Sequence, residues 1–459
     1  MSYRTPKATT IERPSNHEPP AHQSPQAEYA AKLTTADKAV LPIADGSTLC
    51  LALAVGMPGG LAKAVADRIT GGDLKGLNLY YQHSMKYSEA TLIRPEVLSK
   101  VDARCFFMGD PDRKMVKLGI SEGRKYLSYV PINFSNIPRA LTEHIHVDTF
   151  VVSVSPMDKS GHFSLGTNND YASTVLRHCD HVIVEVNPNM PRVFGDSLVH
   201  VSEVHAVVEN DAPLVQIPYV APDPESMKIG KCIAEQIPDG ATVQLGIGNL
   251  PNAVALHLAD RKDLGIHSEL FSHALMQLVR SGVANGRKKT LHPRKHVFTF
   301  AIGDDEVYQF INDNPSMESY ASSYVNDIHI IAQHDNLMSV NTAVEIDLYG
   351  QVNGEFINGH QYSGSGGQFD FVKGASFSQG GKSFIGLKSS AKDGTISCIV
   401  PHVQMATDTR MDVEHIVTEY GMVNLRGRST RERALALISI AHPNFREKLT
   451  KHAKSINLI

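Results

Sequence analysis

Short apolar runs alternate with helix-like stretches along this chain, and the alternation predicts a layered α/β protein. Strand-like runs include TFVVSVSP (149–156), HVIVEV (181–186), HVFTFAI (296–302) and IHIIAQH (328–334), and the apolar run ERALALISIAH (432–442) follows near the end. Such runs, bounded by turn residues, are typical of buried strands. Each half of the chain has too little sequence for a barrel, so we expect open, largely parallel sheets.

An internal repeat divides the chain into two similar α/β domains. The segments Asp45–Arg68 and Asp239–Arg261 both contain an Asp-Gly turn, a short apolar strand, a glycine turn, a proline and a helix that ends on Ala-Asp-Arg. We expect domains over residues 28–222 and 223–459, joined near APDPESM (221–227), with a cleft between them as the ligand site. Residues 1–27 are polar and proline-rich, and we expect a mobile arm there.

Composition excludes several classes of function. The 459 residues carry 44 Lys+Arg against 48 Asp+Glu, so the net charge of -4 offers no general attraction to nucleic acid or to an anionic membrane. No apolar run approaches the ~20 residues that span a bilayer. The cysteines are far apart and form no CxxC pair, which indicates reduced thiols in a cytoplasmic protein. They are Cys50, Cys105, Cys179, Cys232 and Cys398.

Two glycine-rich segments are candidates for ligand binding. YSGSGGQFDF (362–371) contains Gly364, Gly366 and Gly367, which form either a tight turn or a backbone against which a ligand lies. LGIGNLP (245–251) ends an apolar strand and leads into a helix, with Pro251 predicted as the first helical residue. The free N–H groups of the helix start suit a phosphate or an oxyanion, although glycine there also serves packing.

Two familiar nucleotide motifs are absent from these segments. A phosphate-binding loop ending in GGKS (380–383) needs a glycine where Ser376 stands. The dinucleotide pattern G-x-G-x-x-G is broken because Pro251 occupies the third glycine position.

Glu269 is the candidate nucleophile. It lies in Leu264–Phe271, which we predict to be a strand followed by a helix, so the carboxylate comes near the C-terminal end of a strand. A helix-entry carboxylate or an ion pair is the structural alternative. His144 and His146 share one face of a predicted strand, but no third ligand can be named and we predict no metal site. Serine-hydrolase (G-x-S-x-G) and zinc-protease (H-E-x-x-H) motifs do not occur.

Longer motifs in both halves resemble the acetyl-CoA hydrolase/transferase family of class I coenzyme A transferases. Its members include 4-hydroxybutyrate, butyrate–acetate, itaconate and succinate–acetate CoA-transferases. The resemblance covers nearly the whole chain except the arm. The motifs are YVPINFSNIPRAL, VSVSPMDKSGHFSLG, VIVEVNPNMPRVFGDS, LGIGNLPNAV, GIHSELFS, SVNTAVEIDLYGQVN, GSGGQFDF, GGKSFIGLKSSAKDGTISCIVP and VTEYGMVNLRGRSTRERALALISIAHPNFR.

The resemblance implies a mechanism and a set of residues. Glu269 matches the family's catalytic glutamate, which forms a covalent glutamyl-CoA thioester, and the two glycine segments match its CoA-binding turn and second glycine loop. Coenzyme A is then a substrate, alongside small carboxylic acids, and no tightly bound cofactor is expected. The residues expected to bind CoA or stabilise the oxyanion are Gly246, Ile247, Gly248, Asn249, Leu250, Gly364, Gly366, Gly367, Asn341 and Lys392.

The acyl pocket is predicted from the repeat, which places VGMPGG (55–60) opposite the catalytic turn. Met57 and Pro58 supply an apolar wall, His83 a hydrogen bond, and Lys86 or Lys388 a charge for a dicarboxylic acid. These residues favour a broad C2–C5 acyl range that includes a dicarboxylate.

Three residues depart from the family pattern, at positions that bear on CoA contacts and on acid specificity. They are His273 after the catalytic motif, Lys388 where proline is common and Cys398 where arginine is common. The prediction is a CoA-transferase, with an acyl-CoA hydrolase that uses the same glutamate and a non-catalytic CoA-binding module as alternatives. We expect a homo-oligomer, either a dimer or a tetramer.

Overall fold

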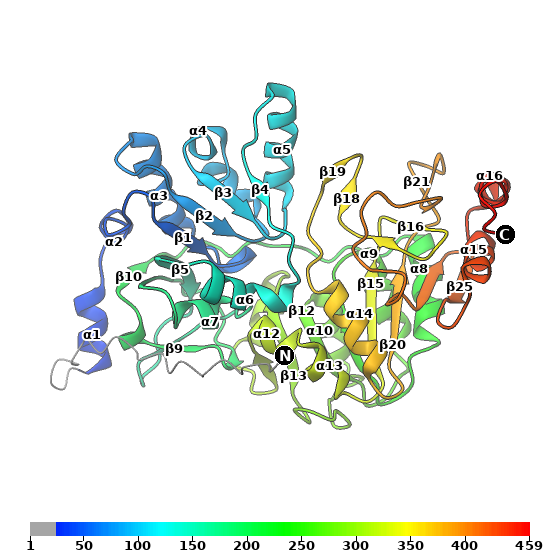
Figure 1. Ribbon diagram of the computed structural model, residues 1–459. Coiled ribbons are helices and arrows are strands. Elements are labelled where there is room, and N and C mark those ends of the chain that lie inside the picture. Colours follow the sequence, from blue (N-terminus) through cyan, green and yellow to red (C-terminus); the bar gives the residue numbers. More distant parts are fainter. Residues whose placement is uncertain (1–23) are drawn as a thin grey trace, which may run out of the picture.

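The computed structural model describes residues 24–459, which form two α/β lobes side by side (Figure 1). Of the expected mobile arm, residues 1–23 lie outside the described part. Residues 25–27 contradict the expectation, because they form the first turn of helix α1 (Pro25–Lys32). Ser24 caps this helix by accepting a hydrogen bond from the N–H of Ala27 (3.2 Å), and Pro25 at the first helical position favours the helix start.

The first lobe contains a seven-stranded parallel sheet. Its strand order is β10-β7-β5-β1-β2-β3-β4. The strands are β1 (Thr48–Leu51), β2 (Asn78–Tyr81), β3 (Asp102–Cys105), β4 (Ser128–Tyr129), β5 (Thr149–Val154), β7 (His181–Val186) and β10 (Ala206–Glu209). Its further helices are α2 (Ala36–Ala39), α3 (Gly59–Gly71), α4 (Pro95–Leu98), α5 (Asp110–Glu122), α6 (Ile137–Arg139) and α7 (Ala172–Leu176).

The second lobe contains a nine-stranded sheet with the order β25-β24-β20-β15-β11-β12-β13-β14-β8, in which only the β24–β25 pair is antiparallel. The strands are β8 (Phe194–Gly195), β11 (Thr242–Leu245), β12 (Gly265–Phe271), β13 (His296–Ala301), β14 (Met317–Ser319), β15 (Leu337–Thr342), β20 (Lys382–Gly386), β24 (His415–Thr418) and β25 (Gly421–Asn424). The helices are α8 (Pro224–Ala234), α9 (Asn249–His257), α10 (His273–Arg280), α11 (Asp305–Ile311), α12 (Ser322–Val325), α13 (Ile328–Ala332), α14 (Gln368–Phe377), α15 (Thr430–Ser439) and α16 (Pro443–Ser455).

Short strands form four small sheets outside these two. They are β6 (His162–Ser164) with β9 (Leu198–His200), β16 (Glu345–Asp347) with β17 (Val352–Asn353) and β23 (Ile399–Val400), β18 (Phe356–Ile357) with β19 (His360–Gln361), and β21 (Ser390–Ala391) with β22 (Ile396–Ser397). No helix within residues 24–459 is long and apolar enough to cross a membrane.

The two large sheets have the same topology, which confirms the predicted pair of open α/β sheets. Numbered in chain order, the seven strands of the first sheet take the same places as β11, β12, β13, β14, β15, β20 and β24 of the second. The repeated segments of the sequence supply the central strands β1 and β11 and the helices α3 and α9 that follow them. Both lobes are therefore built on one plan.

One predicted strand is wrong. Residues 328–332 of the run IHIIAQH form helix α13, and the next strand, β15, begins only at Leu337. Asp327 starts the helix, because its carboxylate accepts hydrogen bonds from the N–H groups of His329 (2.6 Å) and Ile330 (3.3 Å). The capping residue lies just before the apolar run, so the run alone did not reveal it.

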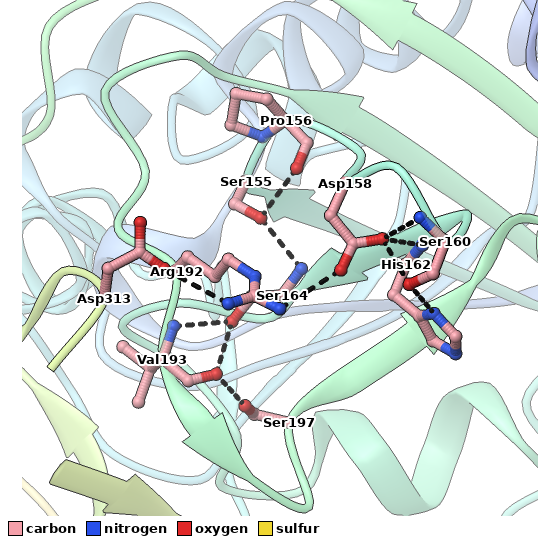
Figure 2. Close-up of polar contacts among 10 residues, drawn as sticks. All are labelled: Ser155, Pro156, Asp158, Ser160, His162, Ser164, Arg192, Val193, Ser197 and Asp313. Atoms are coloured by element: carbon pink, nitrogen blue, oxygen red, sulfur yellow. Dashed lines mark hydrogen bonds and ion pairs between the residues drawn. The ribbon is translucent and has the colours of Figure 1, made fainter. Parts of the chain in front are cut away.

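The lobes are joined by more than the linker, because strand β8 of the first half of the sequence pairs with β14 at the edge of the second sheet. Figure 2 shows the polar contacts around this crossing segment. The guanidinium of Arg192 bridges the lobes, with ion pairs to Asp158 (3.1 Å) and Asp313 (3.2 Å). Next to it, the hydroxyl of Ser164 donates to the carbonyl of Val193 (3.0 Å). The domain boundary between residues 222 and 223 stays a proposal. Strand β8 precedes this boundary in the sequence but belongs to the sheet of the second lobe.

The hydrophobic core also extends across the lobes. Residues of β1 alternate between two core clusters, with Leu49 and Leu51 on the face covered by α3 and Cys50 on the other face. The second cluster includes Leu270 and Phe300 from the second lobe. Strands β12 and β13 therefore present side chains directly to the first lobe, and this contact is where the candidate site lies.

Candidate active site

Glu269 lies on β12, two residues before its end, as predicted from the sequence. Its Oε2 accepts a hydrogen bond from the side-chain amide of Asn326 (2.7 Å), a fully buried residue that follows helix α12. Burial raises the pKa of Glu269 to about 8, and the negative charge of Asp370 adds to this shift. The hydrogen bonds from Asn326 and from the N–H of Gly367 oppose it. The carboxylate is thus held in a site that disfavours its charge.

The second glycine loop lies against Glu269, and a different structural constraint requires glycine at each of its three glycine positions. Gly366 has φ +54°, and a side chain at Gly367 would overlap Glu269 and Asn326. A Cβ at Gly364 would lie 2.6 Å from the carbonyl oxygen of Phe106 in the first lobe. The loop therefore needs glycine for its conformation, for close approach to the carboxylate and for contact between the lobes.

Residues of the first lobe hold this loop in place. The N–H of Phe134 donates to the carbonyl of Gly366 (3.3 Å), and the hydroxyl of Ser365 donates to the carbonyl of Ile132 (3.2 Å). Asp370, which follows the loop on α14, accepts hydrogen bonds from the hydroxyl (2.9 Å) and the N–H (3.1 Å) of Ser135. Burial raises the pKa of Asp370 to about 7, and the bonds from Ser135 oppose that shift.

The first glycine turn connects β11 to α9. Gly248 has φ +106° and open space around it, and residues 247–249 are exposed. Helix α9 begins at Asn249, so Pro251 is its third residue and not its first as predicted. Proline is tolerated there because the N–H groups of the first turn have no partner within the helix. The side chain of Asn249 donates to Asp223 (2.8 Å).

A cavity of about 200 Å³ lies between the lobes and includes Glu269. The first lobe contributes Leu53, Gln82, His83 and Phe107. The second lobe contributes Gln244, Leu245, Gly246, Ile247, Pro251, Glu269, Leu270, Phe300, Ile302, Val340, Asn341, Thr342, Ser365, Gly366, Gly367, Gln368 and Phe371. Glu269 is the one acidic group of this lining, and neither lysine nor arginine is among these residues.

Two further cavities continue from the central one along the second lobe. The first, of about 270 Å³, shares Ile247, Pro251 and Thr342 with the central cavity and also includes Asn249 and Leu250. The second, of about 600 Å³, joins it at Lys388 and includes Lys228 and Lys392. Together they run from the carboxylate over the glycine turn to a region lined by three lysines and by three acidic residues, Glu225, Asp393 and Glu419.

The structure brings some of the predicted residues together and separates others. His83 and Asn341 line the central cavity with Glu269, whereas Lys392 lies at the far end of the three cavities.

Three residues predicted for the acyl pocket lie outside the cavity that contains Glu269. Met57 is buried in the core of the first lobe, Pro58 is buried before α3, and Lys86 is exposed, so none of them lines the cavity. The glycine turn of the first lobe is also closed, because the N–H of Leu61 donates to the buried carboxylate of Glu185 (2.9 Å).

Of the three residues that depart from the family pattern, Lys388 alone lines one of these cavities. Lys388 forms ion pairs with Asp223 (3.1 Å) and Glu225 (3.7 Å), which occupy its charge. His273 begins α10 and contacts Glu306 (3.2 Å). Cys398 is a buried free thiol.

The candidate metal residues do not lie on a strand. His144 ends a short π-helical turn (Ala140–His144) and His146 lies in the following loop. His146 is exposed and contacts Asp180 (3.0 Å) and Asp148 (3.5 Å).

Comparison with known proteins identifies the family. Residues 18–219 match the acetyl-CoA hydrolase/transferase N-terminal domain, and residues 303–453 match the C-terminal domain of the same family. This chain belongs to the acetyl-CoA hydrolase/transferase family. Glu269 and the first glycine turn lie between the two matched ranges, in the segment that supplies strands β11, β12 and β13 of the second sheet.

Relatives within the family span nearly the whole chain. The chain is 41% identical to the 4-hydroxybutyrate coenzyme A transferase of Clostridium kluyveri over 430 residues, which are 93% of this chain and 98% of that protein. It is 38% identical to the butyryl-CoA:acetate CoA-transferase of Anaerostipes caccae over 94% of this chain and 98% of that protein. The crystal structure of RipA from Yersinia pestis is similar with a TM-score of 0.93 at 46% identity, over 95% of this chain and all of that one.

Proposed function

We propose that this chain transfers coenzyme A between short-chain carboxylic acids through a glutamyl-CoA thioester on Glu269. The observation that carries the proposal is the placement of this carboxylate. It lies in an otherwise uncharged cavity between the amide of Asn326 and the backbone of the second glycine loop. Relatives named as CoA-transferases, at 38–41% identity, support the same activity.

The reaction starts when the carboxylate of Glu269 attacks the thioester carbonyl carbon of the donor acyl-CoA. A C–O bond forms, the C–S bond breaks, and CoA leaves as a thiolate, so that a mixed anhydride of Glu269 and the acyl group remains. The thiolate then attacks the glutamyl carbonyl carbon, which forms the enzyme thioester and releases the donor acid as a carboxylate. The acceptor carboxylate enters and the same two steps run in reverse.

Burial of Glu269 favours this chemistry. The site disfavours the charged carboxylate, as the raised pKa shows, whereas the anhydride and the thioester are neutral at that position. Covalent loading therefore removes a buried charge. The backbone N–H of Gly367 contacts the carboxylate, and in this proposal it stabilises the oxyanion that forms on the glutamyl carbonyl.

CoA fits the chain of cavities in the second lobe. The central cavity is smaller than drug-sized ligand sites, which measure about 300–1,000 Å³, so it holds the reacting groups and a short acyl chain. In this proposal the pantetheine arm crosses the turn at residues 246–250, and the phosphates lie near Lys228 and Lys392. Asn341 is then close to the reacting end and Lys392 to the nucleotide.

The acid substrate is a short monocarboxylic acid in this proposal. The dicarboxylate expected from the sequence needs a cation for its second carboxylate, and the structure leaves Lys86 outside the cavity and Lys388 paired with acidic groups. His83 does not supply the charge, because burial and the nearby Arg113 lower its pKa to about 4.

Intact-protein mass measurement tests the mechanism. Incubation with acetyl-CoA or butyryl-CoA should add one CoA to the protein, and added butyrate or acetate should remove it. Glu269→Ala should form no adduct, whereas Glu447→Ala, which changes an exposed glutamate on α16, should load normally. An adduct that persists in Glu269→Ala contradicts the assignment.

The same sample separates transferase from hydrolase. Acetyl-CoA hydrolases are also relatives, such as that of Yarrowia lipolytica at 25% identity over 67% of this chain. In a transferase the CoA adduct persists for much longer than one turnover until a carboxylic acid is added. The adduct should then discharge faster with butyrate than with succinate. Loss of the adduct in buffer alone, at the rate of turnover, identifies a hydrolase.

A further inference from the structure

Gln82 is a buried polar residue that the structure leaves without a partner. It follows β2 in the first lobe, it is 4% exposed, and it lines the same cavity as Glu269. Its Oε1 has no hydrogen-bond partner, and neither side-chain amide atom bonds to any residue within 24–459. Buried amides are nearly always paired in proteins, so an unpaired one that faces a cavity indicates a ligand group.

The repeat allows the two lobes to be aligned residue by residue. Thr48 and Thr242 occupy the same place in the repeated Asp-Gly-x-Thr segments. In the first sheet Thr48 pairs with Asn78 of β2, and in the second sheet Thr242 pairs with Gly265 of β12. Strands β2 and β12 are therefore equivalent, with Asn78 matching Gly265.

This alignment makes Gln82 the counterpart of Glu269. Gln82 lies four residues after Asn78, and Glu269 lies four residues after Gly265. Other residues of the lining are equivalent to one another by the same alignment. The cavity is therefore lined by matching positions of the two lobes. The matching pairs are Leu53 with Ile247, His83 with Leu270, and Phe107 with Phe300.

The residues on either side of Gln82 are fixed by hydrogen bonds, although the side chain of Gln82 makes none to any described residue. The hydroxyls of Tyr81 (2.8 Å) and Ser84 (2.6 Å), on either side of it, both donate to the buried carboxylate of Asp112. Between them, His83 has φ +53°, and its N–H donates to the loop after β3 (2.8 Å). The structure thus presents the amide of Gln82 to the cavity from a fixed frame.

The acid substrate needs hydrogen-bond donors, and Gln82 is the amide side chain of the lining whose donor is free within residues 24–459. The lining contains neither lysine nor arginine, so a carboxylate that enters must be held by neutral hydrogen-bond donors. The other amide side chains of the lining already have protein partners. These are Gln244 with Ser339 (2.9 Å), Asn341 with Ser339 (2.9 Å), and Gln368 with Asp408 (2.6 Å).

We propose that the side-chain amide of Gln82 binds the carboxylate of the acid substrate opposite Glu269. This inference rests on the proposed CoA transfer. The Nε2–H group donates to the oxygen of the acid that does not react, which becomes the carbonyl oxygen of the acyl thioester after transfer. An amide suits this place because a second carboxylate opposite Glu269 would repel the acid. Gln82 positions the substrate and makes or breaks no covalent bond.

Gln82→Met tests the proposal, because methionine keeps the length and volume of glutamine and removes the amide. We expect the second-order rate constant for discharge of the CoA-loaded enzyme by butyrate to fall about 10- to 100-fold, the loss typical of one hydrogen bond to a charged group. The affinity for free CoA should stay within twofold. The melting temperature should stay the same or rise, since no protein group loses a partner.

Two further variants separate substrate binding from structure. Gln244→Met makes the same change at a lining glutamine with protein partners, and we expect its melting temperature to fall. Gln82→Asn keeps the amide but withdraws it by one methylene, and it should recover part of the discharge rate.

Each outcome decides a different point. If wild-type protein forms no CoA adduct, the proposed function fails and this inference fails with it. If wild-type protein loads and Gln82→Met discharges with butyrate within twofold of the wild-type rate, this inference alone is wrong. A fall in melting temperature that matches Gln244→Met also contradicts it, because Gln82 would then be a structural residue.

Discussion

At the scale of one residue, the surroundings of Glu269 determine the pKa of its carboxyl group. The glutamate lies near the end of a strand in an apolar stretch, and the groups that act on its charge come from three other segments: Asn326 after α12, Gly367 of the glycine loop and Asp370 of α14. Burial has the largest effect on the pKa of Glu269, and the hydrogen bond from Asn326 only partly offsets it.

The raised pKa predicts a pH-dependent effect of Glu269→Gln on stability. A carboxyl group whose pKa rises from 4.5 to about 8 on folding stabilises the protein most below pH 4.5, and this contribution is lost as the pH rises through about 8. A glutamine side chain at this position carries no charge at any pH. We expect the variant and the wild type to melt alike near pH 5 and the variant to melt higher, by about 2 °C or more, near pH 9. Differential scanning calorimetry across this range measures it, and a constant difference at all pH values contradicts the raised pKa.

Gly367→Ala should remove activity and leave the fold. The added methyl group would overlap the carboxylate of Glu269 and the amide of Asn326, so both groups must move. A displacement of order 1 Å at the reacting group costs ~100-fold in rate, and we expect at least that loss in adduct formation. Gly59→Ala is the control, because a Cβ there meets open space. Wild-type loading by Gly367→Ala would show that the glycine serves only the turn.

Sequence alone located the residues of the site that lie in continuous motifs. Glu269 and the two glycine segments were predicted because a strand end and a glycine cluster are local signals. Asn326 and Gln82 were missed, since a lone amide has no local pattern and its role depends on which segments meet in space. Met57 was expected to line the acyl pocket, but it packs in the core of the first lobe, and within the same repeated segment it is Leu53 that lines the cavity.

At the scale of elements, strands were easier to predict than helix α13, which is formed by the same kind of apolar run. Runs such as 149–154 and 181–186 are buried on both faces of a parallel sheet, and their apolar character is continuous for that reason. Residues 328–332 look the same, yet the preceding Asp327 begins a helix there. The crossing strand β8 gave no signal at all, because it has only two residues and pairs with a strand more than 120 positions away.

Gly195 of this crossing strand should contribute to stability. It has φ +97°, and a Cβ would overlap the backbone of Ser319 on β14. Gly195→Ala therefore combines backbone strain with a steric clash at the pairing of β8 with β14. Gly72→Ala is the matched control, with φ +86° and open space. We expect the control to lose about 1 kcal/mol of unfolding free energy and Gly195→Ala to lose more, by denaturant titration. Equal losses would mean that β8 adjusts without cost.

At the scale of the whole molecule, the two lobes share one site and one core. The carboxylate comes from the second lobe, the opposing amide from the first, and the glycine loop between them is held by residues of both. The fold class and the repeat were predictable because each lobe repeats the same order of strands. The way the lobes interlock was not, since it depends on contacts between residues that are far apart in the sequence.

The crossing strand has a consequence for any attempt to separate the lobes. If the chain were cut between residues 222 and 223, β8 would leave with the first fragment, and the second fragment would expose the edge of β14. An uncovered edge of this kind pairs with another strand. The two fragments would therefore behave as complementary subunits, and the stability of their complex would depend on protein concentration. One continuous chain keeps the missing strand at hand, so completion of the second sheet does not depend on an encounter between molecules.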